Sequence, residues 1–328
     1  MFKLRSWIDE SKLDWDSISG MEEAYDLIKN NLDKVNWSIL SGNENENVIG
    51  LLEKNKDKID WRVVSANPSA INLLERNQDK IDWMYASLNP SAIDLLKKNP
   101  DKIHWRALSG NKNAIDLLKT NTDKIYWPYL NSNQNAIEIL EKNQDKLYDN
   151  ILLNKNAFDL IQKMFEKYPD WIGHPWILEN PSAIEFIEQN LNPSNPNRIY
   201  SDFSWKLFSQ NRHPKTIKLL EKNLDKASWS FLSRRSDAIH ILEKNMDKID
   251  WYALSKNENA MHILEKNQDK ICWDRFSTNP AIFELDYQAL KSRCAIYKEE
   301  LIQEALNPSR IFKSLDKGMD LEDLLENM

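Results

Sequence analysis

The chain has 328 residues and a formal net charge of −7, from 44 Lys and Arg against 51 Asp and Glu. Because the two signs are mixed along the whole sequence, no strong basic field is available to hold phosphates, and we expect no nucleic-acid partner. Two cysteines make no disulfide framework, the start lacks the apolar run of a signal peptide, and no stretch approaches the ~20 apolar residues of a membrane span. We expect a soluble, cytoplasmic protein that does not contact a membrane.

Residues 1–13 are predicted to form a short N-terminal cap, and a repeat array follows over residues 14–283. Tryptophan recurs along this array at intervals of 22 or 24 residues, with an irregular stretch at 146–204. A fixed period of this length indicates one elongated repeat domain, in which each unit packs only on its neighbours. The tryptophans expected to form a structural core ladder are Trp15, Trp37, Trp61, Trp83, Trp105, Trp127, Trp205, Trp229, Trp251 and Trp273.

Each unit is predicted to hold two short helices, as the unit that begins at Asp60 illustrates. Asp60 is a good N-cap for a helix that starts at Trp61, and Asn67 is a good N-cap for a second helix with Pro68 in its first position. The second helix carries an Ala-Ile and a Leu-Leu pair that form one apolar stripe. Asn77, which closes the unit, is predicted to adopt a left-handed backbone conformation.

This pattern predicts an all-α fold: a right-handed α-solenoid of stacked two-helix repeats of about 22 residues with terminal caps. Helices this short are not stable alone, so the stacking of units has to stabilise them. We expect the tryptophans to pack between units, with each indole N–H donating to a carbonyl oxygen of an adjacent unit. Residues 284–328 are predicted to form a helical cap, with residues 287–307 covering the apolar end of the last repeat.

The repeated unit reads Trp-x-x-Leu-Ser-x-Asn-Pro-x-Ala-Ile-x-Leu-Leu-Glu-x-Asn-x-Asp-Lys-Ile. It resembles the short Trp/Asn repeats of proteins that giant DNA viruses of amoebae encode. The stretch from Met1 to Trp15 is similar to the usual start of those proteins, and the stretch from Asn279 to Ile311 is similar to their usual end. The resemblance covers nearly the whole chain except residues 146–204, where Asp149 stands in the tryptophan position. Since that family is largely uncharacterised, the resemblance implies no catalytic residue.

The histidines do not indicate a metal site. His240 and His262 occupy the same position in successive units, and helices stacked ~8–10 Å apart keep the two rings from sharing a zinc ion. We expect both histidines to lie on a solvated helix face. The sequence therefore predicts no metal, no cofactor and no catalytic residue.

The dipeptide Asp-Lys recurs near the end of the units, for example at Asp79 and Lys80. One interpretation is a turn and cap residue with a solvated partner, and the other is a charged ladder that serves for docking. The Glu-Lys pairs of the second helices, such as Glu141 and Lys142, have the pattern of a self-neutralising exposed face.

The irregular stretch at 146–204 holds the candidate binding residues. Segments 171–176 and 192–198 interrupt the period, and insertions in repeat proteins often map to the binding face. The alternative interpretation is a decayed repeat that only bends the solenoid. The candidate contact residues are Trp171, His174 and Trp176.

The sequence favours a non-enzymatic scaffold that binds another protein through an extended surface, by analogy with other solenoids. Two alternatives stay open at this point. The first is a structural or self-associating component of a viral particle or assembly, and the second is an enzyme with a site in the irregular middle. We expect a monomer or weak homo-oligomer in the cytoplasm, or in the host cytoplasm if the chain is viral, and association with a virion also stays open.

Overall fold

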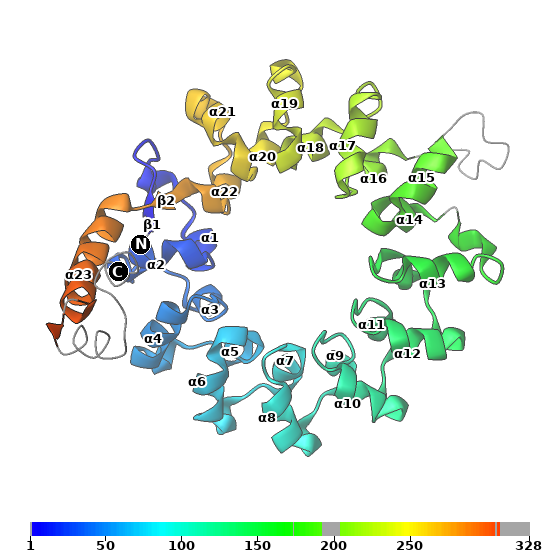
Figure 1. The fold of residues 1–328 in the computed structure, drawn as a ribbon, viewed down its shortest axis with the longest axis horizontal. Coiled ribbons are helices and arrows are strands. Elements are labelled where there is room, and N and C mark those ends of the chain that lie inside the picture. Colours follow the sequence, from blue (N-terminus) through cyan, green and yellow to red (C-terminus); the bar gives the residue numbers. More distant parts are fainter. Residues whose placement is uncertain (1, 173, 192–203, 306, 309–328) are drawn as a thin grey trace.

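The computed structural model describes residues 2–172, 174–191, 204–305 and 307–308. It shows two layers of short helices that follow a closed circle (Figure 1). The all-α repeat architecture is as the sequence predicts. The array is not elongated with two free ends, however, because its first and last units lie side by side. The prediction of an elongated array is therefore wrong.

The inner layer of the ring consists mostly of the helices that begin at the tryptophans (Figure 1). The residue before the tryptophan caps the helix, as Asp60 does by accepting hydrogen bonds from the N–H groups of Arg62 and Val63 at 3.1 and 3.2 Å. The inner helices are α1 (Trp15–Ser19), α3 (Trp37–Leu40), α5 (Trp61–Ala66), α7 (Trp83–Leu88), α9 (Trp105–Leu108), α11 (Trp127–Asn131), α14 (Pro175–Glu179), α16 (Trp205–Phe208), α18 (Trp229–Arg234), α20 (Trp251–Leu254) and α22 (Trp273–Phe276).

The outer layer consists of the second helices, whose Leu-Leu pairs are buried against the inner layer, as at Leu73 and Leu74. Five of the eleven outer helices in the described residues follow directly on a 3-10 turn, such as Pro68–Ala70 before α6, whereas units of 24 residues have one continuous α-helix. The outer helices are α2 (Tyr25–Asn30), α4 (Glu46–Lys54), α6 (Ile71–Glu75), α8 (Ile93–Lys98), α10 (Ile115–Lys119), α12 (Ile137–Lys142), α13 (Phe158–Lys163), α15 (Ile184–Leu191), α17 (Pro214–Glu221), α19 (Ile239–Leu242) and α21 (Met261–Lys266).

The asparagine at the end of the outer helices is not left-handed, so that prediction is wrong. Asn55, Asn99 and Asn143 have φ values of −129°, −131° and −133°. The side-chain amide satisfies the helix end instead, since Asn55 Nδ2 donates to the carbonyl oxygen of Leu51 at 2.8 Å. The chain then continues directly into a 3-10 turn, here Lys56–Lys58, without the reversal that a left-handed residue would give.

A serine four residues after the tryptophan links each regular unit to the next. Ser65 Oγ donates to the carbonyl oxygen of Trp61 at 2.7 Å and accepts from the N–H of Asp82 at 2.9 Å. Ser65 is fully buried, so water does not compete for either bond. The same two bonds recur at Ser19, Ser41, Ser87, Ser109, Ser209, Ser255 and Ser277.

A buried asparagine two residues further on forms a second link, which we call the asparagine ladder. Asn111 Nδ2 donates to the carbonyl oxygens of Ser87 and Asn89 in the preceding unit, at 3.0 and 2.9 Å. Its Oδ1 accepts from the N–H of Asn113 at 3.0 Å. The same pattern is present at Asn43, Asn67, Asn89, Asn133, Asn154, Asn180, Asn211 and Asn257.

The tryptophans of the predicted ladder pack at the edge of the core, and each is partly buried. In several units the lysine of the Asp-Lys dipeptide lies over the indole, as Lys34 and Lys124 do over Trp15 and Trp105 at 4.8 and 4.6 Å. Within the described residues, the ladder indoles other than that of Trp205 make no hydrogen bond through N–H, and these groups keep contact with solvent. The predicted bonds to carbonyl oxygens of adjacent units are therefore not formed.

The ring closes where two short strands meet (Figure 1). Strand β1 (Phe2–Leu4) pairs antiparallel with β2 (Phe283–Leu285), so that Lys3 faces Glu284. Arg5 extends the pairing, because its N–H donates to the carbonyl oxygen of Ile282 at 3.0 Å. We call this junction, residues 2–14 with 273–285, the seam.

The start of the chain supplies the part that the last unit lacks. Lys12 lies 5.1 Å above the ring of Trp273, as the Asp-Lys lysines do in other units. The N–H of Asp14 donates to Ser277 Oγ at 2.9 Å, which continues the serine link across the seam. Trp7 packs against Phe276, with ring centroids 5.6 Å apart. The segment predicted as an N-terminal cap thus completes the ring.

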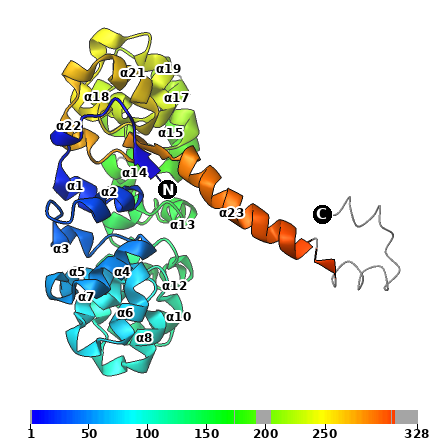
Figure 2. The same ribbon diagram turned by 90° about the vertical axis from the view of Figure 1, so that its left-hand side faces the viewer.

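Helix α23 (Tyr287–Ala305) leaves the ring beside the seam and projects out of its plane (Figure 2). Apart from Leu290, its described side chains are exposed, so it does not cover the end of the array as predicted. Ring closure explains this difference, since the first unit already covers that end. Residues 309–328 of the predicted cap lie outside the described residues. In the described part of the chain, no helix is both long and apolar enough to cross a bilayer.

The asparagine ladder predicts a large effect of an isosteric change. Asn111→Asp should lower the free energy of unfolding by roughly 3 kcal/mol, because a carboxylate cannot donate to the two carbonyl oxygens and would be buried against them. Chemical denaturation measures this difference. The matched control is Asn113→Asp, an exposed position whose side chain makes one bond, to the carbonyl oxygen of Pro90. Equal losses in the two variants would contradict the role of the ladder.

Candidate functional site: a basic pocket along the inner helices

The candidate contact residues from the irregular middle take part in local packing. Trp171 is 8% exposed and stacks on Tyr168, with ring centroids 4.5 Å apart. His174 caps α14, its Nδ1 accepting from the N–H of Trp176 at 3.2 Å, and the rings of these two residues lie 4.8 Å apart. Segment 192–198 lies outside the described residues. Trp171 is thus buried, whereas His174 and Trp176 are only partly buried.

The ring continues through the irregular middle without losing the asparagine ladder. Asn154 and Asn180 each donate to two carbonyl oxygens of the preceding unit, although Asp149 and Pro175 stand where tryptophans stand elsewhere. Asn211, which follows α16, likewise donates to the carbonyl oxygens of Leu178 and Asn180 in the preceding described unit. The described part of residues 146–204 is therefore a set of stacked units that lacks the ladder tryptophan and the linking serine but keeps the asparagine ladder.

An open pocket of about 670 Å³ lies along the next arc of the ring, between α16 and α22. It is lined by residues of α18 and α20, by the segments that follow α16, α18 and α20, which include parts of the 3-10 turns Ser236–Ala238 and Glu258–Ala260, and by Arg275 of α22. Several consecutive units thus contribute to one surface, which is possible because each unit presents the same side of its inner helix.

The pocket carries a concentration of positive charge that the even mixing of charges in the sequence does not reveal. Arg212, Arg234, Lys256 and Arg275 line it, are exposed, and make no ion pair within the described residues. Of the acidic lining residues, Asp237 is already paired, which leaves Glu258. A concave surface lined mainly by one sign of charge attracts ligands of the opposite sign.

Aromatic side chains hold two of these cations in place. Arg275 Cζ lies 4.5 Å from the ring centre of Tyr252, and Arg234 Cζ lies 5.5 Å from that of Phe231. A guanidinium stacked on a ring keeps its N–H donors free for a carboxylate or phosphate. Tyr252 itself is 54% exposed, and exposed tyrosine beside arginine is typical of residues that dominate protein interfaces.

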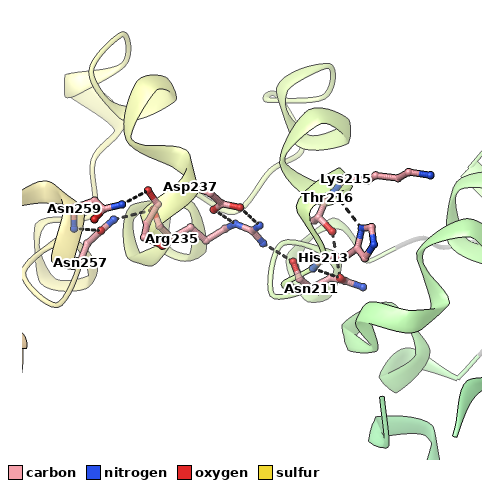
Figure 3. A network of polar contacts seen from close by, with 9 residues as sticks. Asn211, His213, Lys215, Thr216, Arg235, Asp237, Asn257 and Asn259 are labelled. Atoms are coloured by element: carbon pink, nitrogen blue, oxygen red, sulfur yellow. Dashed lines mark hydrogen bonds and ion pairs between the residues drawn. The ribbon is translucent and has the colours of Figure 1, made fainter. Parts of the chain in front are cut away.

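The asparagine ladder has a different residue at this pocket. Arg235 stands at the ladder position, where its guanidinium donates to the carbonyl oxygen of Asn211 (Figure 3). Nε and Nη2 of the same group bind Asp237 Oδ1 and Oδ2 at 2.8 and 2.6 Å. Asn257 of the next unit donates to the carbonyl oxygen of Arg235 at 2.9 Å, so the link between units is maintained. The arginine pair at 234–235, in place of the usual x-Asn, is the sequence signal that could have located the pocket.

The histidines of the outer helices pair with acids of the preceding unit. Nε2 of His240 lies 2.5 Å from Oε1 of Glu221, and Nε2 of His262 lies 2.8 Å from Oε1 of Glu243. All four side chains are exposed. Among the residues that the structure describes, no group of three or more His, Cys, Asp or Glu is placed to hold a metal ion.

No protein-family model, no curated protein and no solved structure matches this chain. The surface chemistry of the ring is therefore what indicates a function.

Substitution of Arg235 tests the local structure of the pocket. Arg235→Ala should lower the free energy of unfolding by about 2–3 kcal/mol, because the carbonyl oxygen of Asn211 and the carboxylate of Asp237 both lose a charged donor. Arg235→Asn restores the usual ladder residue and should recover at least half of that loss. Urea denaturation of both variants measures the difference, and an alanine variant as stable as the parent chain would contradict this account.

Proposed function

We propose that the ring is a non-enzymatic scaffold that binds a protein partner, and that the pocket between α16 and α22 holds an acidic segment of that partner. The observation that carries the proposal is the set of cations without ion pairs in the described residues, two of which stack on the exposed ring of Tyr252 and the partly buried ring of Phe231. Carboxylates are the protein groups that match arginine forks, and side chains of the partner would pack against Tyr252 and Phe231.

The exposed apolar and aromatic side chains of the other inner helices favour a protein partner over a nucleic acid. Met84 and Leu88 of α7 and Tyr129 of α11 are 45%, 41% and 43% exposed. Surfaces that track a nucleic-acid backbone need positive charge along their whole length, whereas apolar and aromatic side chains interleaved with arginine are common at protein interfaces. The net charge of −7 also opposes a polyanion outside the pocket.

Arginine and tyrosine pairs also bridge neighbouring units on this layer. Arg62 of α5 lies 4.7 Å from the ring centre of Tyr85 in α7, and Arg106 of α9 lies 5.3 Å from that of Tyr129 in α11. The pair in the pocket, Tyr252 with Arg275, joins α20 and α22 in the same way. Pre-formed stacks reduce the side-chain entropy that binding would otherwise cost, so the inner layer is suited to a partner that extends beyond the pocket.

Charge reversal in the pocket tests this function. The probe is a fluorescein-labelled polyglutamate peptide, followed by fluorescence anisotropy at low and at physiological salt. Arg234→Glu combined with Lys256→Glu should raise the dissociation constant by at least about tenfold, since two attractive contacts become repulsive. Added salt should weaken binding to the parent chain because the cations are exposed.

The matched control is Lys244→Glu combined with Lys266→Glu, which changes the net charge equally in the same two units but on their outer side. This control should bind the peptide as the parent chain does. Equal losses in both double variants would overturn the proposal, because they would reflect net charge alone. A labelled oligo-dT that binds more tightly than the peptide, and loses affinity in the pocket variant only, would identify a nucleic-acid site instead.

A further inference from the structure

The sequence of this chain contains a segment with the chemistry that the pocket between α16 and α22 is proposed to bind. Segment 319–328 reads Met-Asp-Leu-Glu-Asp-Leu-Leu-Glu-Asn-Met and lies outside the described residues. Four of its residues within a stretch of seven are acids, and no other seven consecutive residues of the sequence hold four acids. The acids are Asp320, Glu322, Asp323 and Glu326. With no Lys or Arg beside them, these carboxylates match the cations of the pocket in sign and in number.

The spacing of the acids matches the spacing of the units that line the pocket. Arg212, Arg234 and Lys256 come from successive units, and helices packed side by side lie ~8–10 Å apart. An extended chain with three residues per turn rises ~3.1 Å per residue, so every third side chain points to the same side about 9 Å further on. Three carboxylates at this interval can each face a cation of a different unit. The acids at this interval in the sequence are Asp320, Asp323 and Glu326.

The residues between these acids suit the aromatic side chains of the pocket. Leu321, Leu324 and Leu325 separate the acids in the sequence. Phe231 and Tyr252 line the pocket, and Tyr252 is 54% exposed. Apolar contacts between leucine and aromatic rings, beside ion pairs with arginine, are typical of protein interfaces. The segment therefore offers both kinds of contact that the pocket can make.

The chain between α23 and segment 319–328 is long enough to reach the pocket. Helix α23 follows the seam, which α22 also joins, and α22 borders the pocket. The 19 residues of α23 span ~28 Å, and the middle of the pocket lies one to two units, or ~10–20 Å, along the ring from α22. The end of α23 is thus roughly 35 Å from the pocket, whereas residues 306–319 can span up to ~46 Å.

We propose that segment 319–328 binds in the pocket of its own chain and so competes with the partner. This inference rests on the acid-binding role of the pocket proposed above, to which it adds regulation. Because the segment is tethered, its effective concentration at the pocket is on the order of 1 mM, and an intrinsic dissociation constant of ~0.1 mM then weakens the binding of another acidic ligand about tenfold. Only a partner that displaces the segment gains the pocket.

Neutralisation of the segment in the intact chain tests this competition. The variant with all four acids neutralised should bind the labelled polyglutamate peptide about tenfold more tightly than the parent chain, because the segment no longer competes. Its substitutions are Asp320→Asn, Glu322→Gln, Asp323→Asn and Glu326→Gln. The matched control neutralises four exposed acids of α12, α21 and α23, and should change the dissociation constant less than about twofold at physiological salt. Its substitutions are Glu141→Gln, Glu265→Gln, Glu299→Gln and Glu300→Gln.

A fluorophore on the segment reports its binding without an added ligand. In a chain with Cys272 and Cys294 replaced by Ser, Asn327→Cys carries the dye one position after the last acid. Reversal of Arg234 and Lys256 to Glu should lower the anisotropy of the dye, because a released segment reorients faster. The double variant on the outer side of the ring, which has the same net charge, should leave the anisotropy unchanged.

The outcomes separate this inference from the proposed function. If the neutralised variant binds the peptide no more tightly than its matched control, while reversal of the pocket cations still weakens binding, the inference alone is overturned. A dye anisotropy that does not respond to reversal of the pocket cations also overturns it. An anisotropy that rises with protein concentration would place the segment in the pocket of a second copy and contradict the contact within one chain. Failure of every chain to bind the peptide overturns the proposed function, and the dye still tests the contact.

Discussion

The ring depends on buried hydrogen bonds that run from one unit to the next. Each regular unit holds its neighbour through a serine hydroxyl and an asparagine amide whose partners are backbone groups, as Ser65 and Asn111 illustrate. An unpaired buried donor or acceptor costs more than a formed bond contributes, so these links fix the spacing between units more strictly than apolar packing alone can. The tryptophans lie at the edge of the core and stabilise it from there.

Closure of the ring is the result of repeating that geometry around a circle. The serine link passes from Ser277 to Asp14 as it does between units that are adjacent in sequence. The start of the chain also brings Lys12 over Trp273 and pairs β1 with β2. Because the first unit already covers the end of the last unit, α23 has no apolar end to cover and projects out of the plane of the ring. The closed layer of inner helices likewise brings Arg212, Arg234, Lys256 and Arg275 from successive units onto one surface.

The sequence was sufficient to predict the structure of one repeat unit, but it was insufficient to predict how the units assemble into a ring. Caps such as Asp60, the two helices of each unit and the repeat length follow from local chemistry, which a single sequence contains. Closure of the ring depends on a small rotation from each unit to the next, which accumulates around the circle. The residue pattern of the repeat does not predict that angle. The pocket was missed because Arg234 and Lys256 are 22 positions apart, and only the stacking of units makes them neighbours. The break in the tryptophan period drew attention to Trp171, which the fold buries.

The most direct test of the account is a disulfide across the seam. In a chain with Cys272 and Cys294 replaced by Ser, Phe2→Cys and Leu285→Cys place two thiols on directly opposed residues of β1 and β2, a separation of about 4.5–5.5 Å between Cα atoms that a disulfide can span. A closed ring predicts rapid, intramolecular cross-linking on mild oxidation, seen as a shift in non-reducing electrophoresis. Phe2→Cys with Leu88→Cys, on α7 at a distance along the ring, should not cross-link. A seam pair that cross-links no faster than this control would contradict ring closure.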